Sequence, residues 1–134
     1  MRERSIEFAV QDFEATIASA RAGDLVYCDP PYIGRHVDYS NGWTEQDERR
    51  LCKLLTDSPA DFIVSTWFGN QYRTNKFIEE LWAETKVLTR EHFYHLGANL
   101  ENRGSMTEAM IHSDGLGPRT YPLLPAHETP DVLF

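Results

Sequence analysis

Short runs of β-branched and aromatic residues alternate along this chain with longer segments of helical periodicity. Strands are predicted at 5–10, 24–28, 62–67, 87–94 and 107–113. Helices are predicted between most of these strands, at 12–22, 44–57 and 74–83. Such alternation of strands and helices is typical of an α/β fold.

Three features of the pattern specify how the strands would pair. The run at 62–67 is apolar almost throughout, so we expect a central strand that is covered on both faces. The strand at 5–10, the helix after it and the strand at 24–28 form a unit that implies parallel pairing of its two strands. A loop alone joins the last two strands, which predicts an antiparallel hairpin at one sheet edge.

The ends of the helices have their own signals. Gly23 is expected to end the first helix, and Thr44 with Asp47 nearly matches a capping box at the start of the second. The second helix has an apolar stripe and a charged side that we expect to face water. The stripe consists of Leu51, Cys52, Leu54 and Leu55, and the charged residues are Glu48, Arg49, Arg50 and Lys53.

Length and composition fit one small globular domain. The chain has 134 residues, of which 41% are hydrophobic and 25% are charged, as in ordinary soluble proteins. Cys28 and Cys52 are too few for a disulfide framework and are expected to be reduced packing residues. No apolar run has the length of a membrane span and no signal-peptide core follows Met1, so we expect a cytoplasmic protein.

The strand at 24–28 runs directly into Asp29-Pro30-Pro31-Tyr32. The prolines fix the backbone and Pro31 favours an extended conformation before it, so the Asp29 carboxylate and nearby carbonyl oxygens are held outward in a rigid frame. Tyr32 adds a flat aromatic ring. A carboxylate, fixed carbonyl acceptors and an aromatic face suit a planar group with an exocyclic amine, such as a flipped nucleobase.

With its flanks, this motif resembles the D12 class of adenine-N6 DNA methyltransferases, the Dam-like group. The flanks are Asp12-Phe13, the strand beginning near Gly23-Asp24, Tyr39-Ser40 and the helix from Thr44. The resemblance implies the second half of a catalytic domain over 1–113, followed by an irregular tail at 114–134. The implied fold is a partial three-layer Rossmann-like methyltransferase fold that lacks its first strands and has an antiparallel edge hairpin.

The same resemblance implies the chemistry and the roles of individual residues. S-adenosylmethionine would donate a methyl group to a flipped adenine of double-stranded DNA, as in restriction-modification systems. Asp29, Pro30, Pro31 and Tyr32 would form the catalytic motif, with the Asp29 carboxylate and the Pro30 carbonyl accepting the hydrogens of the adenine amine and Tyr32 stacking on the base. Asp12 and Phe13, together with Asp29, would bind the cofactor. Two of these residues have a simpler interpretation, in which Asp12 caps the first helix and Phe13 packs in the core.

Two loops are expected on the same edge of the sheet. The loop at 33–43 contains arginine, histidine and aromatic residues that suit phosphate contact and base stacking, and Tyr39 is a candidate substrate contact. A second loop is expected at 68–72. His92 and His95 have a metal-like spacing, but further ligands are not nearby, so no metal site is predicted.

The chain departs from the family at its front. The glycine-rich cofactor loop, the acidic residue that holds the ribose and the target-recognition region are missing. We therefore expect one subunit of a split enzyme with a companion chain carrying the N-terminal half, a fragment of a longer protein, or an inactive remnant. The net charge of −8 agrees with all three, because the absent region would supply the contacts with DNA.

Other functions stay open at this point. The Asp-Pro-Pro-Tyr loop could serve a non-catalytic α/β binding module as a protein contact. A related methyltransferase could act on cytosine N4, on RNA adenine or on a protein glutamine. Asp29 favours adenine in DNA, although the motif chemistry overlaps across these substrates.

Overall fold

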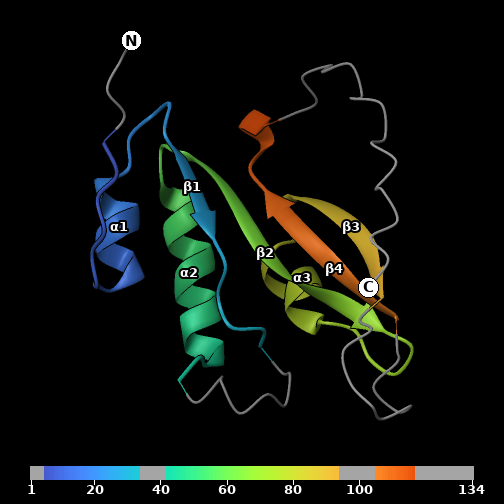
Figure 1. Cartoon of the computed structure of the whole chain (residues 1–134). Helices are drawn as coiled ribbons and strands as arrows, with labels where there is room; N and C mark the ends of the chain where they lie inside the picture. The colour runs from blue at the N-terminus through green and yellow to red at the C-terminus, as the bar shows by residue number, and fades with distance from the viewer. Residues whose placement is uncertain (1–4, 34–41, 94–104, 117–134) are drawn as a thin grey trace, which may run out of the picture.

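A mixed four-stranded sheet with helices on one face forms the molecule (Figure 1). The computed structural model describes residues 5–33, 42–93 and 105–116. The strands are β1 (Leu25–Cys28), β2 (Asp61–Asn70), β3 (Lys86–Phe93) and β4 (Ser105–His112). Their order in the sheet is β1-β2-β4-β3, with β1 and β2 parallel and the other pairs antiparallel. The predicted hairpin of the last two strands is confirmed.

Within the described residues, three α-helices and a short 3-10 helix accompany the sheet. They are α1 (Phe13–Ser19), α2 (Glu45–Asp57), α3 (Lys76–Leu81) and η2 (Asp114–Leu116). The 3-10 helix corrects the expectation that regular structure is absent directly after residue 113, and the rest of the predicted tail, 117–134, lies outside the described residues. None of the described helices combines the length and the apolar character that crossing a membrane requires.

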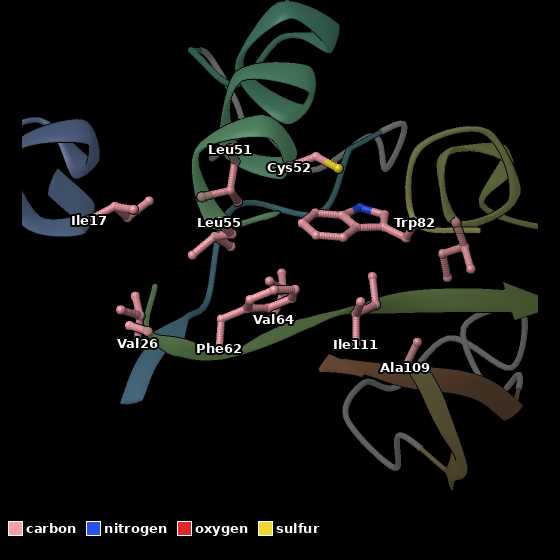
Figure 2. Close-up of a cluster of buried hydrophobic side chains, with 12 residues drawn as sticks. Ile17, Val26, Leu51, Cys52, Leu55, Phe62, Val64, Trp82, Ala109 and Ile111 are labelled. Atoms are coloured by element: carbon pink, nitrogen blue, oxygen red, sulfur yellow. The ribbon is translucent and has the colours of Figure 1, made fainter. Parts of the chain in front are cut away.

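The hydrophobic core lies between the three α-helices and one face of the sheet (Figure 2). The helices contribute Ile17, Leu51, Leu55, Ile78 and Trp82, and the strands contribute Val26, Phe62, Val64, Ala109 and Ile111. These strand residues share one face because side chains alternate along a strand. The face is sealed from solvent, since Val64 and Ile111 are both 0% exposed.

Part of the opposite face of the sheet is apolar and exposed. Leu25 and Tyr27 of β1 are 55% and 59% exposed, and Leu88 of β3 and Met110 of β4 are 60% and 42% exposed. The expectation that 62–67 is covered on both faces is therefore wrong for the described residues, because Ile63 and Ser65 of β2 are only half-buried. The apolar residues on this face of the sheet are thus more numerous than the described residues cover.

The predicted strand at 5–10 is also wrong. This segment has no regular secondary structure, and its alternating apolar residues Ile6, Phe8 and Val10 are 78–108% exposed. A strand needs a neighbour for its backbone hydrogen bonds, and β1 pairs with β2 in parallel. The predicted pairing of 5–10 with 24–28 is not formed.

The sequence signals for helix ends were accurate at the start of α2 and approximate at the end of α1. Thr44 caps α2 through a complete capping box with Asp47, as the sequence predicted. The first helix ends at Ser19, before Gly23, whose φ of 94° places it in the turn that leads into β1. Glycine adopts this left-handed conformation without the strain that a Cβ would add.

Glu48 corrects the prediction for the charged side of α2. The residue is 2% exposed, in contrast to Arg49, Arg50 and Lys53, which are exposed as expected. Its carboxylate accepts hydrogen bonds from the indoles of Trp43 and Trp82. Glu48 lies three, four and seven positions before Leu51, Cys52 and Leu55, so the helical period places it on the buried stripe, and only its charged side chain had indicated solvent.

Both cysteines are free thiols, as expected. The strand β2 is longer than predicted, because Phe68–Asn70 continue it where a loop was expected. Gly69 and Asn70 pair with Thr107 and Met106 of β4 after a register shift that follows Trp67. The antiparallel neighbour extends β2 beyond the apolar run.

We predict that Leu55→Ala lowers the free energy of unfolding by about 2–5 kcal/mol, because it leaves a cavity between α2 and the sheet. Leu55 is 1% exposed. The matched control Leu88→Ala removes the same atoms from the exposed face and should change stability by less than about 0.5 kcal/mol. Urea denaturation of both variants measures the difference, and equal losses would contradict the assignment of the core.

Candidate functional site

Asp29 lies where β1 ends, and its side chain is exposed. A cavity of about 320 Å3 opens beside it. The walls of this cavity come from the segment 11–17, from β1 with Asp29 and Pro30, and from Trp43 and Leu51. The cavity therefore joins the start of the Asp-Pro-Pro-Tyr motif to the start of α1, and Asp29 and Phe13 line it together, whereas Asp12 is not among its lining residues.

Phe13 forms part of the cavity wall and is half-buried. Its ring packs against Trp43 with 5.5 Å between the ring centroids and a tilt of 54°. The guanidinium of Arg50 lies 4.3 Å from the centroid of the Phe13 ring, a cation–π distance. These contacts hold the Phe13 ring from two elements, the segment before α2 and α2 itself.

Asp12 stands next to the cavity and carries out the simpler of its two predicted roles. It is the N-cap of α1, and its carboxylate accepts a hydrogen bond from the Glu14 N–H at 2.9 Å. Nη2 of Arg50 donates to Oδ1 and Oδ2 of Asp12 at 3.0 and 2.8 Å. The Glu14 N–H first, and then Arg50, lower the pKa of Asp12 below its ordinary value of 3.8.

The backbone that follows Tyr32 is fixed by a tryptophan of β2. Nε1 of Trp67 donates to the Ile33 carbonyl at 2.7 Å, and the indole is 3% exposed. Arg73 lies over the same indole, 5.3 Å from its centroid. The hydrogen bond from Trp67 thereby ties the backbone after the motif to β2, the parallel neighbour of β1.

The other predicted site residues lie as follows: Tyr32 is half-buried, Pro31 is exposed, and Tyr39 lies outside the described residues.

Sequence reasoning missed the roles of Trp43 and Arg50. Trp43 immediately precedes the cap residue Thr44, the position from which an apolar side chain commonly packs against the fourth helical residue. That residue is Glu48, which accepts the Trp43 indole N–H at 2.9 Å. The capping box was therefore the signal that could have located Trp43. Arg50 and Asp12 are 38 positions apart, so no pattern within a few residues of either one could have predicted their contact.

At this site the Asp29 carboxylate can accept hydrogen bonds from a ligand that lies beside the aromatic rings of Phe13 and Trp43. Cys28 lines the cavity, but burial raises the pKa of its thiol, which disfavours the nucleophilic thiolate. Within the described ranges, histidine, cysteine and carboxylate side chains do not gather in groups of three or more that could hold a metal ion. The Asp29 carboxylate is an exposed hydrogen-bond acceptor in the lining of the cavity.

Comparison with known proteins identifies related sequences. The family model for D12 class N6 adenine-specific DNA methyltransferase matches residues 1–96. Type II methyltransferase M1.LlaDCHI of Lactococcus lactis subsp. cremoris is 29% identical over 123 residues, covering 86% of this chain and 42% of that protein. Retron Ec67 DNA adenine methylase of Escherichia coli is 43% identical over 49 residues, covering 36% of this chain and 17% of that protein. The chain spans less than half the length of these relatives.

We predict that Arg50→Ala raises the pKa of Asp12 only part of the way to 3.8, because the larger effect of the Glu14 N–H persists. In the unaltered chain, the lowered pKa means that Asp12 stabilises the fold above pH 3.8 and that this contribution is lost as the pH falls through the lowered value. The Arg50→Ala variant should lose less stability over this interval.

Carboxyl carbon shifts followed by NMR during an acid titration measure the pKa. Arg49→Ala serves as the control, since Arg49 pairs with Glu45 rather than with Asp12. An Asp12 pKa that is the same in Arg50→Ala and in the unaltered chain would contradict the assigned ion pair.

Proposed function

This chain belongs to the D12 class of N6 adenine-specific DNA methyltransferases, and we propose that it supplies the catalytic motif of such an enzyme. The reaction would transfer a methyl group from S-adenosylmethionine to the N6 amine of an adenine flipped out of double-stranded DNA. The observation that carries this proposal is the cavity shared by Asp29, Pro30 and Phe13. Asp29 and Pro30, the expected amine-binding residues, line it together with Phe13, and this supports the proposal.

Asp29 and Pro30 would orient the substrate amine. The lone pair of an adenine amine is delocalised into the ring, so the amine is a poor nucleophile. If the Asp29 carboxylate and the Pro30 carbonyl accept its two hydrogens, the nitrogen moves toward tetrahedral geometry and its lone pair becomes available. Tyr32 would stack on the flipped base and offset part of the cost of unstacking, a few kcal/mol for a paired base.

The residues beside the cavity suit the adenosyl part of the cofactor. When bound, S-adenosylmethionine supplies an activated methyl group on its sulfonium. Phe13 offers an aromatic edge in the wall. Asp12 already accepts from Glu14 and Arg50, but a carboxylate has about four acceptor positions, so it can accept an adenine amine as well. Pro31 would contribute by fixing the backbone conformation of the motif.

We further propose that this chain is one part of a three-layer Rossmann-like domain completed by a companion polypeptide segment. The edge of β1 faces no other strand of the described sheet, and β1 exposes Leu25 and Tyr27. Parallel strands are normally covered on both faces. The same companion would cover the exposed apolar residues of the segment 5–10.

The companion would also supply most contacts with DNA. The chain has a net charge of −8, whereas affinity for DNA comes largely from lysine and arginine at the phosphates. The target-recognition region would therefore lie in the companion, and Tyr39 would contribute at most one contact near the flipped base. We also propose a cytoplasmic location, with which a DNA substrate is consistent.

We predict that this chain by itself binds S-adenosylmethionine weakly or not at all, because part of the cofactor site lies in the companion. Isothermal titration of the full chain measures this directly. Micromolar affinity would show that the chain holds a complete cofactor site and would contradict the need for a companion. Restoration of affinity on adding the missing part of the domain would support it.

We predict that Asp29→Ala in the complete methyltransferase lowers the rate of methylation on the order of 100-fold to 1,000-fold, because it removes one acceptor of the amine hydrogens. DNA binding should be retained. The assay follows tritium transferred from labelled S-adenosylmethionine to DNA that lacks adenine methylation, with Asp24→Ala as a control carboxylate outside the cavity. Unchanged methylation would refute the catalytic role, and loss of partner binding instead would favour a binding module.

A further inference from the structure

Glu48 is a buried carboxylate to which the proposed chemistry assigns no role. It lies in the first turns of α2 and is 2% exposed. Burial of a carboxylate is costly unless its oxygens accept hydrogen bonds. Both oxygens of Glu48 do so, and both donors are indoles.

The two indoles come from different parts of the chain, Trp43 from the segment before α2 and Trp82 from the end of α3. Nε1 of Trp43 donates to Oε2 of Glu48 at 2.9 Å, and Nε1 of Trp82 donates to Oε1 at 3.4 Å. Trp43 lines the cavity and packs against Phe13. Trp82 is 1% exposed, and its ring centroid lies 6.0 Å from that of Phe62 in the core. One carboxylate thus connects a wall of the cavity to the most deeply buried indole.

Glutamate suits this position better than glutamine. The carboxylate offers two acceptor oxygens for two N–H donors, whereas an amide would direct an NH2 group toward one of them. The start of a helix also favours negative charge. Glu48 also acts on Cys52, one helical turn later. The pKa of the Cys52 thiol is raised to about 11, first by burial and second by the charge of Glu48.

We propose that Glu48 is a positioning residue that fixes the cofactor-binding cavity by holding the Trp43 indole against Phe13. This inference rests on the proposed function for the identity of the ligand. The hydrogen bond decides which way the Trp43 ring faces, and the ring in turn limits the space beside Phe13. Glu48 does not contact the cavity, so it acts through Trp43 alone.

The test compares Glu48→Gln with the full unaltered chain, labelled with 15N in its three tryptophans. We expect the indole N–H signals of Trp43 and Trp82 to shift and their hydrogen exchange to accelerate on the order of tenfold. The Trp67 indole, which donates to Ile33, is the internal control and should not change. Nuclear Overhauser contacts between the rings of Trp43 and Phe13 should disappear.

Glu45→Gln is the matched control variant, because Glu45 lies in the same turn of α2 but is exposed and pairs with Arg49. It should leave all three indole signals in place. If Glu48→Gln does not fold, Trp43→Phe keeps an aromatic ring while it removes the donor and part of the ring area, and it should lose the contact with Phe13 as well. Retention of that contact in either folded variant overturns the proposal.

Kinetics of the complete enzyme separate positioning from general stability. Glu48→Gln should raise KM for S-adenosylmethionine on the order of tenfold while KM for DNA stays unchanged. Equal changes in both values, or none, would overturn the inference. An unaltered enzyme without methylation activity would refute the proposed function, whereas the NMR comparison would still decide whether Glu48 orients Trp43.

Discussion

The parallel pairing of β1 with β2 is the constraint on which the rest of the structure depends. Because the two strands run in the same direction, the residues after β1 and the last residues of β2 lie at one edge. The two prolines stop β1 at that edge, and the Trp67 indole on β2 holds the backbone carbonyl of Ile33 just beyond the motif. The carboxylate of Asp29 is presented to solvent as a result.

One face of the sheet is covered by helices, and the other face is exposed in the described part of the chain. The helical face of the sheet is packed around residues such as Val64 and Ile111, which solvent does not reach. The other face and the β1 edge leave Leu25, Tyr27 and Leu88 exposed. Apolar side chains at those positions gain free energy only when another surface covers them. The proposed companion accounts for this asymmetry and for the length of the relatives at the same time.

Indole hydrogen bonds recur at the structural supports of the site. Trp67 fixes the exit of the motif, and Trp43 and Trp82 share Glu48. Each indole combines a large apolar ring with a single directional donor, so it can pack in a core and still hold a polar group in one orientation. In the described part of the chain, buried polar side-chain atoms all have partners. The cavity is thus framed by a satisfied polar network rather than by packing alone.

Local sequence determined the elements whose signals lie within a few residues. The strand that runs into Asp29, the capping box at Thr44, the apolar stripe of α2 and the hairpin of the last two strands follow from propensity, capping and side-chain period. The motif and its flanks also indicated the family. These features depend on neighbours in the sequence, which is why they could be predicted without a structure.

Tertiary structure alone decided the features that depend on distant partners. Ser5–Val10 has the alternation of a strand but lacks a neighbouring strand, and Phe68–Asn70 join β2 because β4 pairs with them. Glu48 accepts a hydrogen bond from the Trp82 indole, which lies 34 positions away, and Asp12 pairs with Arg50 of α2, 38 positions away. Each of these outcomes requires contact between segments far apart in the chain, and the period of a single segment carries no information about which contact will form.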